Sequence, residues 1–298
     1  MPAPAAREKI APVRPGQEQR VTLAQSIPHL ITLSMSGLLL SVGLRTDLPD
    51  LLTLLRRPGL LLRSIVAMKI VMPLFAVGAA LAFDLNHAVE GALIALALSP
   101  VPPMLPEKGL KAGGTRGYVV GLLFVASLVS IVFVPVAAHL VGRLFNHAVD
   151  VTAGGVARIV VVWMLVPLLA GSLVRAAAPR LALRVAGPLA TVSNVLVLAA
   201  VPVLVEAWPQ MMTLVGHFSV LAIVAFVLVG LAVGHLMGGP KPGDRTVLAL
   251  AVATRHPAVA LAILHLDADR RSAAAAVLLV MLLSALTAIP YLRWRSHA

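Results

Sequence analysis

Long apolar segments recur along the whole chain and limit the folds that it can adopt. Hydrophobic residues make up 59% of its 298 residues and charged residues only 12%, unlike the composition of a soluble domain. The segments run for about 17 to 25 residues without the alternation of barrel strands, so they predict membrane-spanning helices rather than a β-barrel. We therefore expect an all-α polytopic membrane protein with about nine helices, near residues 27–44, 59–83, 88–111, 115–145, 153–177, 184–206, 211–237, 244–265 and 272–292.

The composition also excludes several classes of function. The net charge is +12, but the basic residues form short clusters between apolar segments and aromatic residues are only 4%, which argues against a nucleic-acid partner. The chain has no cysteine, so disulfides, thiolate zinc sites and thiol catalysis are excluded. No nucleophile, base and orienting group occur together, and no metal ligands have the required spacing. We expect neither an enzyme nor a bound cofactor or metal.

The basic residues are concentrated in alternate connections, which predicts the orientation in the membrane. We expect the basic side to face the cytoplasm, with the N-terminus outside, the C-terminus inside and the protein in the cell (inner) membrane. Residues 1–26, rich in Pro, Ala and Arg, are expected to form a mobile tail before one transmembrane domain, residues 27–298. This tail is itself basic and argues against the orientation, but one tail weighs less than five consistent connections. The basic side carries Arg45, Arg56, Arg57, Arg63, Lys111, Arg116, Arg175, Arg180, Arg184, Lys241, Arg245, Arg293 and Arg295.

Two apolar segments are interrupted by proline and ionisable residues, at residues 99–108 and 254–257. A proline has no backbone N–H and prevents the helical hydrogen bond to the carbonyl four residues before it. In a membrane, a carbonyl freed in this way is tolerated only beside water, a bound ion or a partner side chain. The two interruptions lie at corresponding places in two halves of the chain, which is typical of a transporter's central site. The carbonyls expected to be freed are those of Leu98, Ser99, Pro102 and Ala253.

Ionisable side chains lie at both interruptions: Glu107 and Lys108 at the first, Arg255 and His256 at the second. A charge at the bilayer centre costs about 2.5–3.5 kcal/mol, so we interpret these residues as a substrate or coupling site. The alternative is that Glu107 and Lys108 lie near the cytoplasmic end of their helix and are simply solvated. Lys69 is a further candidate in the second segment, although its long stem could let the ammonium reach the membrane surface.

A set of short motifs occurs in order from about residue 27 to the C-terminus. It consists of Ser41-Val42-Gly43-Leu44, Arg57-Pro58, Met72-Pro73, Pro102, Leu110-Lys111-Ala112-Gly113-Gly114, and Arg255-His256 before Ala260-Leu261-Ala262. This ordered set resembles the bile acid:sodium symporter superfamily. The resemblance implies an inverted-repeat transporter with two broken helices that cross in a core domain, near residues 59–145 and 211–292. A panel domain would comprise the helices near residues 27–44 and 153–206.

The chain differs from the resembled family where its members bind sodium. Sodium-using members carry Ser-Asn where this chain aligns Glu107 and Lys108, and Gln-Asn where it aligns Arg255 and His256. Further family ligands, a Gln and a Ser, align with Met68 (beside Lys69) and Tyr118. The resemblance thus implies a site whose side-chain oxygens have been replaced, partly by fixed positive charges.

We interpret the chain as a transporter that moves an organic anion, bile-acid-like or a small carboxylate or sulfonate, by alternating access. In this interpretation Lys108 and Arg255 replace two sodium ions, with Glu107 as the counter-ion. The substrate lies between the two domains, where Arg255, His256 and Lys108 meet its acidic group, beside the break at Pro102. If protons couple transport instead, Glu107 or His256 carries them. The residues are also compatible with a sodium-coupled symporter of the same family, and with a non-transporting membrane sensor whose crossing is locked by salt bridges.

Overall fold

The computed structural model describes residues 15–145, 151–198, 200–216, 218–264 and 269–296 of the chain. Within these ranges the regular structure is entirely helical. Seven helices are long and apolar enough to cross a membrane, and two shorter apolar helices, His29–Gly43 and His87–Leu98, accompany them. The prediction of a polytopic membrane protein with about nine helices is therefore confirmed.

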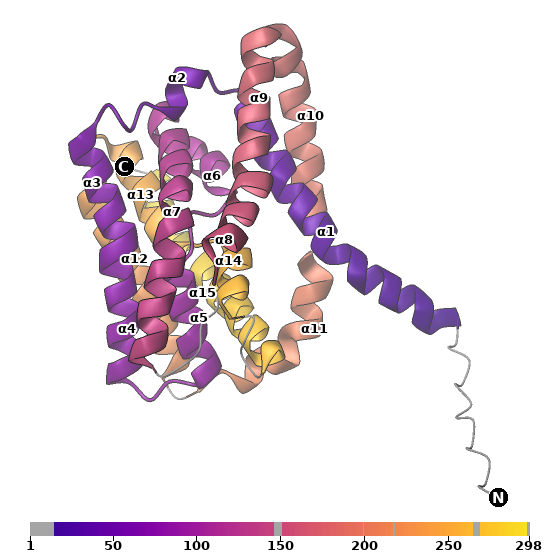
Figure 1. Ribbon diagram of the computed structural model, residues 1–298, viewed down its shortest axis with the longest axis vertical. Helices are drawn as coiled ribbons and strands as arrows, with labels where there is room; N and C mark the ends of the chain where they lie inside the picture. Colours follow the sequence, from indigo (N-terminus) through magenta and orange to yellow (C-terminus); the bar gives the residue numbers. More distant parts are fainter. Residues whose placement is uncertain (1–14, 146–150, 199, 217, 265–268, 297–298) are drawn as a thin grey trace, which may run out of the picture.

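The helices follow the expected order along the chain (Figure 1). Five of the predicted spans consist of several consecutive pieces. Residues 59–83 correspond to α3, η1 and α4, residues 88–111 to α5 and α6, residues 153–177 to α8, η2 and α9, residues 184–206 to α10 and α11, and residues 244–265 to α13 and α14. The elements η1 and η2 are single π-helical turns. The bounds are α1 (Pro15–Gly43), α2 (Leu48–Leu51), α3 (Pro58–Val66), η1 (Ala67–Val71), α4 (Met72–Ala82), α5 (His87–Leu98), α6 (Leu105–Lys111), α7 (Arg116–Leu144), α8 (Ala153–Val160), η2 (Val161–Leu165), α9 (Val166–Ala177), α10 (Pro179–Val197), α11 (Ala200–Thr213), α12 (Ser219–Met237), α13 (Pro242–Ala253), α14 (Pro257–Ile263) and α15 (Arg270–Ser296).

The first helix is longer than expected, since α1 begins at Pro15 within the segment that composition assigned to a mobile tail. Residues 16–26 contain no proline and several good helix formers, so the helix extends backwards from its apolar part. It starts at Pro15 because proline suits the first turn of a helix. The N-terminal part of α1 projects away from the other helices (Figure 1), and residues 1–14 of the expected tail lie outside the described residues.

The basic connections gather at one end of the molecule, the upper end in Figure 1, where α2, the α9–α10 hairpin and the C-terminal end of α15 lie. Two contacts tie them together. Arg116 donates a hydrogen bond to the carbonyl of Arg45 at 2.6 Å, and Arg175 forms an ion pair with Asp47 at 3.2 Å. The alternation of basic connections in the sequence therefore corresponds to a real end of the bundle, called the basic end below.

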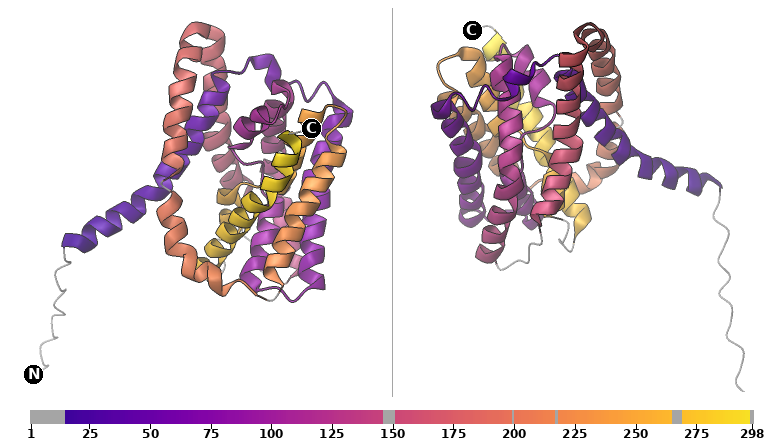
Figure 2. Two further views of the ribbon diagram at one scale, coloured as in Figure 1. Left: turned by 180° about the vertical axis from the view of Figure 1, so that it is seen from behind. Right: turned by 45° about the horizontal axis from the view of Figure 1, so that its top comes forward.

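Helices α1, α9 and α10 pack together on one side of the molecule (Figures 1 and 2). α1 and α9 approach closely because two glycines face each other across the contact: a Cβ on Gly43 would overlap the carbonyl of Leu168, and Gly171 is equally crowded. The hydroxyl of Ser41 donates to the carbonyl of Ala186 on α10 at 2.7 Å. Small residues and a hydroxyl group thus hold these three helices together, as in other membrane bundles.

A second group of helices is built around the contact between α12 and α13, with α15 packed against α5 and α12. Gly230 and Gly234 are four residues apart on α12, so they lie on one face. A Cβ on either glycine would collide with the backbone of α13, at Ala253 and Ala249 respectively. This close contact holds α13, and with it the second interruption of the sequence, against α12.

Candidate functional site

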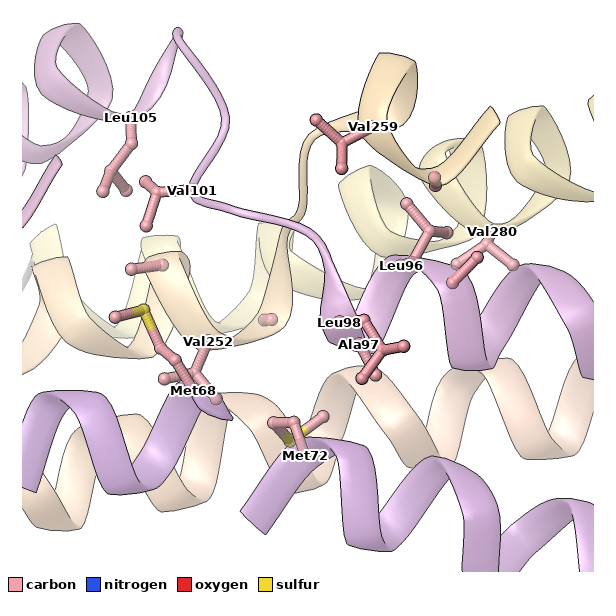
Figure 3. Packing of buried hydrophobic residues seen from close by; sticks show 14 of the residues in the cluster. Met68, Met72, Leu96, Ala97, Leu98, Val101, Leu105, Val252, Val259 and Val280 are labelled. Carbon is pink, nitrogen blue, oxygen red and sulfur yellow. The ribbon is translucent and has the colours of Figure 1, made fainter. Parts of the chain in front are cut away.

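The two interruptions of the sequence meet in the structure. Helix α5 ends at Leu98 and α6 begins at Leu105, while α13 ends at Ala253 and α14 begins at Pro257. The backbone N–H of His256 donates to the carbonyl of Pro100 at 3.0 Å, so the extended segments of both breaks touch. Figure 3 shows the segment between Leu98 and Leu105 passing beside the second break. We call this contact the crossing.

Lys69 supplies the hydrogen bonds that the first break removes. Its Nζ donates to the carbonyls of Leu98 at 3.0 Å and Ser99 at 3.3 Å. In a continuous helix these carbonyls would accept from the N–H groups of residues 102 and 103, but both are proline. The prediction that proline frees the carbonyls of Leu98 and Ser99 is therefore confirmed, and the partner is a lysine that is only 4% exposed. The prediction was wrong for Pro102, whose carbonyl accepts a hydrogen bond from the backbone N–H of Leu105 at 3.0 Å.

Arg255 performs the same task at the π turn η1. The N–H of Met72 donates to the carbonyl of Ala67, five residues earlier, so the next donor in this π register would be residue 73. Residue 73 is Pro73, which has no N–H, and the carbonyl of Met68 is left without a backbone donor. Arg255 Nη2 donates to this carbonyl at 3.1 Å. Met68 thus contributes to the site through its backbone, while its side chain packs in the apolar core (Figure 3).

Several polar atoms at the crossing have no hydrogen-bond partner among the described residues. They are Nε and Nη1 of Arg255 and Nδ1 of His256, and both side chains are buried. None of the ion pairs within the described ranges involves Lys69 or Arg255. An unpaired buried polar group costs about 1–3 kcal/mol, so a ligand that accepts hydrogen bonds would be favoured here.

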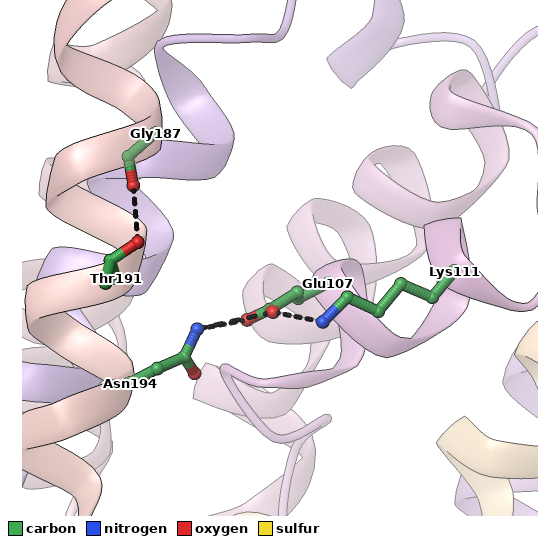
Figure 4. Close-up of polar contacts among 5 residues, drawn as sticks. All are labelled: Glu107, Lys111, Gly187, Thr191 and Asn194. Atoms are coloured by element: carbon green, nitrogen blue, oxygen red, sulfur yellow. Dashed lines mark hydrogen bonds and ion pairs between the residues drawn. The ribbon is translucent and has the colours of Figure 1, made fainter.

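The first break does not hold Glu107 and Lys108 at the crossing, which differs from the predicted arrangement. Glu107 accepts hydrogen bonds from Lys111 at 2.7 Å and from Asn194 on α10 at 3.3 Å (Figure 4). Lys108 is exposed. The reason is that α6 restarts at Leu105, so both residues lie on a regular helix beyond the break. Glu107 is therefore not the counter-ion of Arg255, and Lys108 does not occupy a carbonyl site.

A cavity of about 380 Å³ extends to the crossing between α6, α12, α13 and α15. Its wall is mostly apolar and includes Phe226 and Val280. Two cationic residues belong to the wall, Lys108 from α6 and Arg255 from the second break, and Pro102 of the first break also lines it. The cavity can therefore receive a molecule with an apolar body and a negative group.

Tyr118 is placed elsewhere. Its hydroxyl is hydrogen-bonded to Ser64 at 2.9 Å, which links α7 to α3, and it takes no part in the hydrogen bonds described for Lys69 and Arg255. Sequence reasoning did not identify Asn194, which faces Glu107, or Phe133, whose ring centre lies 5.0 Å from Lys69 Nζ. It also missed the pairing of Lys111 with Glu107, although their i,i+4 spacing was a readable signal of a helical ion pair.

Comparison with known proteins identifies one family. The sequence model described as the Sodium Bile acid symporter family matches residues 32–207, which is more than half of the chain. The matched region contains the first break, Lys69 and η1. No curated protein matches the chain.

Proposed function

Because this chain belongs to the sodium bile acid symporter family, we propose that it is a secondary transporter that carries an organic anion by alternating access. The single observation that supports this most is the cavity of about 380 Å³ that reaches Arg255 at the crossing. This volume lies in the range of small-molecule sites. In this proposal α1 and α8–α11 form a panel, the remaining long helices form a core, and transport requires the two to move against each other.

The proposed substrate class follows from the wall of the cavity. An apolar lining suits a steroid-like or other hydrophobic body, while Lys108 and Arg255 suit a carboxylate or sulfonate. Arg255 retains two nitrogen atoms, Nε and Nη1, without partners among the described residues, and a guanidinium N–H donates a charge-assisted hydrogen bond to such a group. Lys108 is thus assigned to anion binding rather than to the replacement of a sodium ion.

We propose in addition that transport does not require sodium. Sodium needs several oxygen ligands, and the carbonyls of Leu98, Ser99 and Met68 already accept hydrogen bonds from buried cationic side chains. The residues at the crossing therefore do not fit a sodium ion. A sodium-coupled symporter of the same family is the alternative. If protons couple transport, His256, buried at the crossing, is better placed than Glu107, which faces α10.

A non-transporting sensor with a salt-bridged crossing is the second candidate, from a different functional class. It requires Glu107 to pair with Lys108 or Arg255 inside the crossing. Glu107 instead pairs with Lys111, and the cavity extends to Arg255. Both observations favour transport. For the orientation, we propose that the basic end faces the cytoplasm, because Lys and Arg accumulate in the cytoplasmic loops of membrane proteins.

Ligand-induced thermal stabilisation of the purified protein tests the substrate proposal. We expect one or more amphipathic organic anions, tested as a panel of steroid sulfonates and small carboxylates, to raise the melting temperature by mass action. With Arg255→Gln, the same rise in melting temperature should require a ligand concentration at least about tenfold higher, since a charge-assisted pair contributes about 1.5–3 kcal/mol. Arg180→Gln, on the exposed start of α10, is the matched control and should leave it unchanged. Equal stabilisation of both variants would contradict the role of Arg255.

A further inference from the structure

The ammonium group of Lys69 contacts two backbone carbonyls and an aromatic ring. Its Nζ is 3.0 Å and 3.3 Å from two carbonyl oxygens, of Leu98 and Ser99, and 5.0 Å from the ring centre of Phe133. Backbone carbonyls are the ligands that ion channels use for monovalent cations, and an aromatic face attracts a cation at this distance. Carbonyls and an aromatic ring together provide a cation site without any carboxylate.

The backbone creates this site independently of the lysine. Pro102 and Pro103 remove the two N–H groups that would otherwise satisfy Leu98 and Ser99, whichever residue occupies position 69. The site also lies at the C-terminal end of α5, where the helix dipole is negative and stabilises a positive charge. Without Lys69, both carbonyls would be buried and unpaired, which is unfavourable.

The charges around the site favour a monovalent over a divalent cation. Arg255 lies on the neighbouring carbonyl of Met68 and brings a second positive charge to the crossing. Among the described residues, neither Lys69 nor Arg255 is paired with a carboxylate. A divalent ion would find no anionic ligand here, whereas a monovalent ion or a primary ammonium would fit the carbonyls.

We propose that the break after Leu98 is a monovalent-cation site and that Lys69 is its built-in occupant. This explains why the crossing does not fit sodium, and it extends the sodium-independent transport proposed above. It does not depend on the identity of the anion, and its test needs no transport. The cation-site proposal can therefore hold even if the transport proposal fails, and the experiment below can contradict it without reference to transport.

Thermal unfolding of the full-length protein in detergent tests the inference through chemical rescue. The variant Lys69→Ala is compared in choline, sodium and n-propylammonium chloride at equal ionic strength; propylammonium matches the part of the lysine side chain that alanine lacks. We expect Lys69→Ala to melt below wild type in choline and to gain about 2–4 °C in propylammonium or sodium. Wild type should respond equally to all three salts, because its site is filled.

Two variants control for the loss of a lysine in general. Lys69→Met keeps most of the length of the side chain but not its charge, and it fills most of the space that alanine leaves, so it should be destabilised and not rescued by either cation. Lys111→Ala removes an exposed ammonium and should behave as wild type does towards the three salts. If Lys69→Ala cannot be purified in choline, the proposal requires that sodium or propylammonium during purification restores folded protein. Absence of any cation-specific rescue, or an equal rescue of Lys69→Met, would overturn it.

Discussion

At the scale of single residues, prolines determine which backbone carbonyls at the crossing lack a backbone donor. Pro102 and Pro103 leave the last carbonyl of α5 and the carbonyl of the next residue, Ser99, without donors, and Pro73 does the same for one carbonyl of η1. Each of the three carbonyls is met by a buried cationic side chain, Lys69 or Arg255. Side chains thus replace the missing backbone hydrogen bonds at the breaks.

Arg255 is expected to be sensitive even to a conservative change. Lys at this position keeps the positive charge but cannot donate in a fork to both the carbonyl of Met68 and a bound anion. We expect Arg255→Lys to reduce affinity for the stabilising anion about tenfold, because the loss of one hydrogen bond to a charged group has an effect of this size. Isothermal titration of detergent-solubilised protein measures this. An unchanged affinity would show that only charge matters at this position.

Asp269 provides a pH-dependent cap at the start of α15. It accepts hydrogen bonds from the hydroxyl and the backbone N–H of Ser272, and these bonds, the hydroxyl bond most strongly, lower the pKa of Asp269. A lowered folded-state pKa stabilises the helix start above the unfolded pKa of about 3.9, and the effect is lost as the pH falls through the folded value. We expect amide protection in the first turn of α15 to decrease below about pH 4. Asp269→Ala should show this low amide protection already at neutral pH. If amide protection changed neither with the fall in pH nor with the substitution, Asp269 would not act as a cap.

At the scale of helices, close packing by glycine is expected to dominate stability in the second helix group. A Cβ on Gly234 would collide with the backbone of Ala249, so Gly234→Ala should destabilise by about 1–3 kcal/mol. Gly78 on α4 has no heavy atom within 4 Å of its would-be Cβ, so Gly78→Ala should stabilise by up to about 1 kcal/mol through helix propensity. Thermal unfolding of the two variants should shift in opposite directions. Shifts of the same sign would contradict the close contact between α12 and α13.

Much of the element order could be predicted from the sequence, because membrane helices satisfy their own backbone and need long apolar runs. The two breaks could be predicted for the same reason, since proline removes donors locally. The prediction that Glu107 is the counter-ion at the crossing was wrong, because the position of Glu107 depends on where α6 restarts after the break. Asn194 and Phe133 could not be found, since they come from α10 and α7 and reach the site only through tertiary packing.

At the scale of the whole molecule, a polar contact joins α6 of the proposed core to α10 of the proposed panel. Glu107 on α6 faces Asn194 on α10 (Figure 4), so movement of a panel against a core must separate them. The chain has no cysteine, which allows cross-linking without background. We expect Glu107→Cys/Asn194→Cys to be joined by a short bifunctional reagent and to lose transport until the link is cleaved. Full transport by the cross-linked protein would exclude relative motion at this contact.

The central claim is that an anion transporter carries its own cations at the crossing of its broken helices. It is tested most directly by uptake into proteoliposomes of the anion that stabilises the protein most, with sodium or choline as the external cation. Because Lys69 and Arg255 already occupy the carbonyls of the crossing, the rate should be the same in both media. Loss of uptake when choline replaces sodium would contradict the claim.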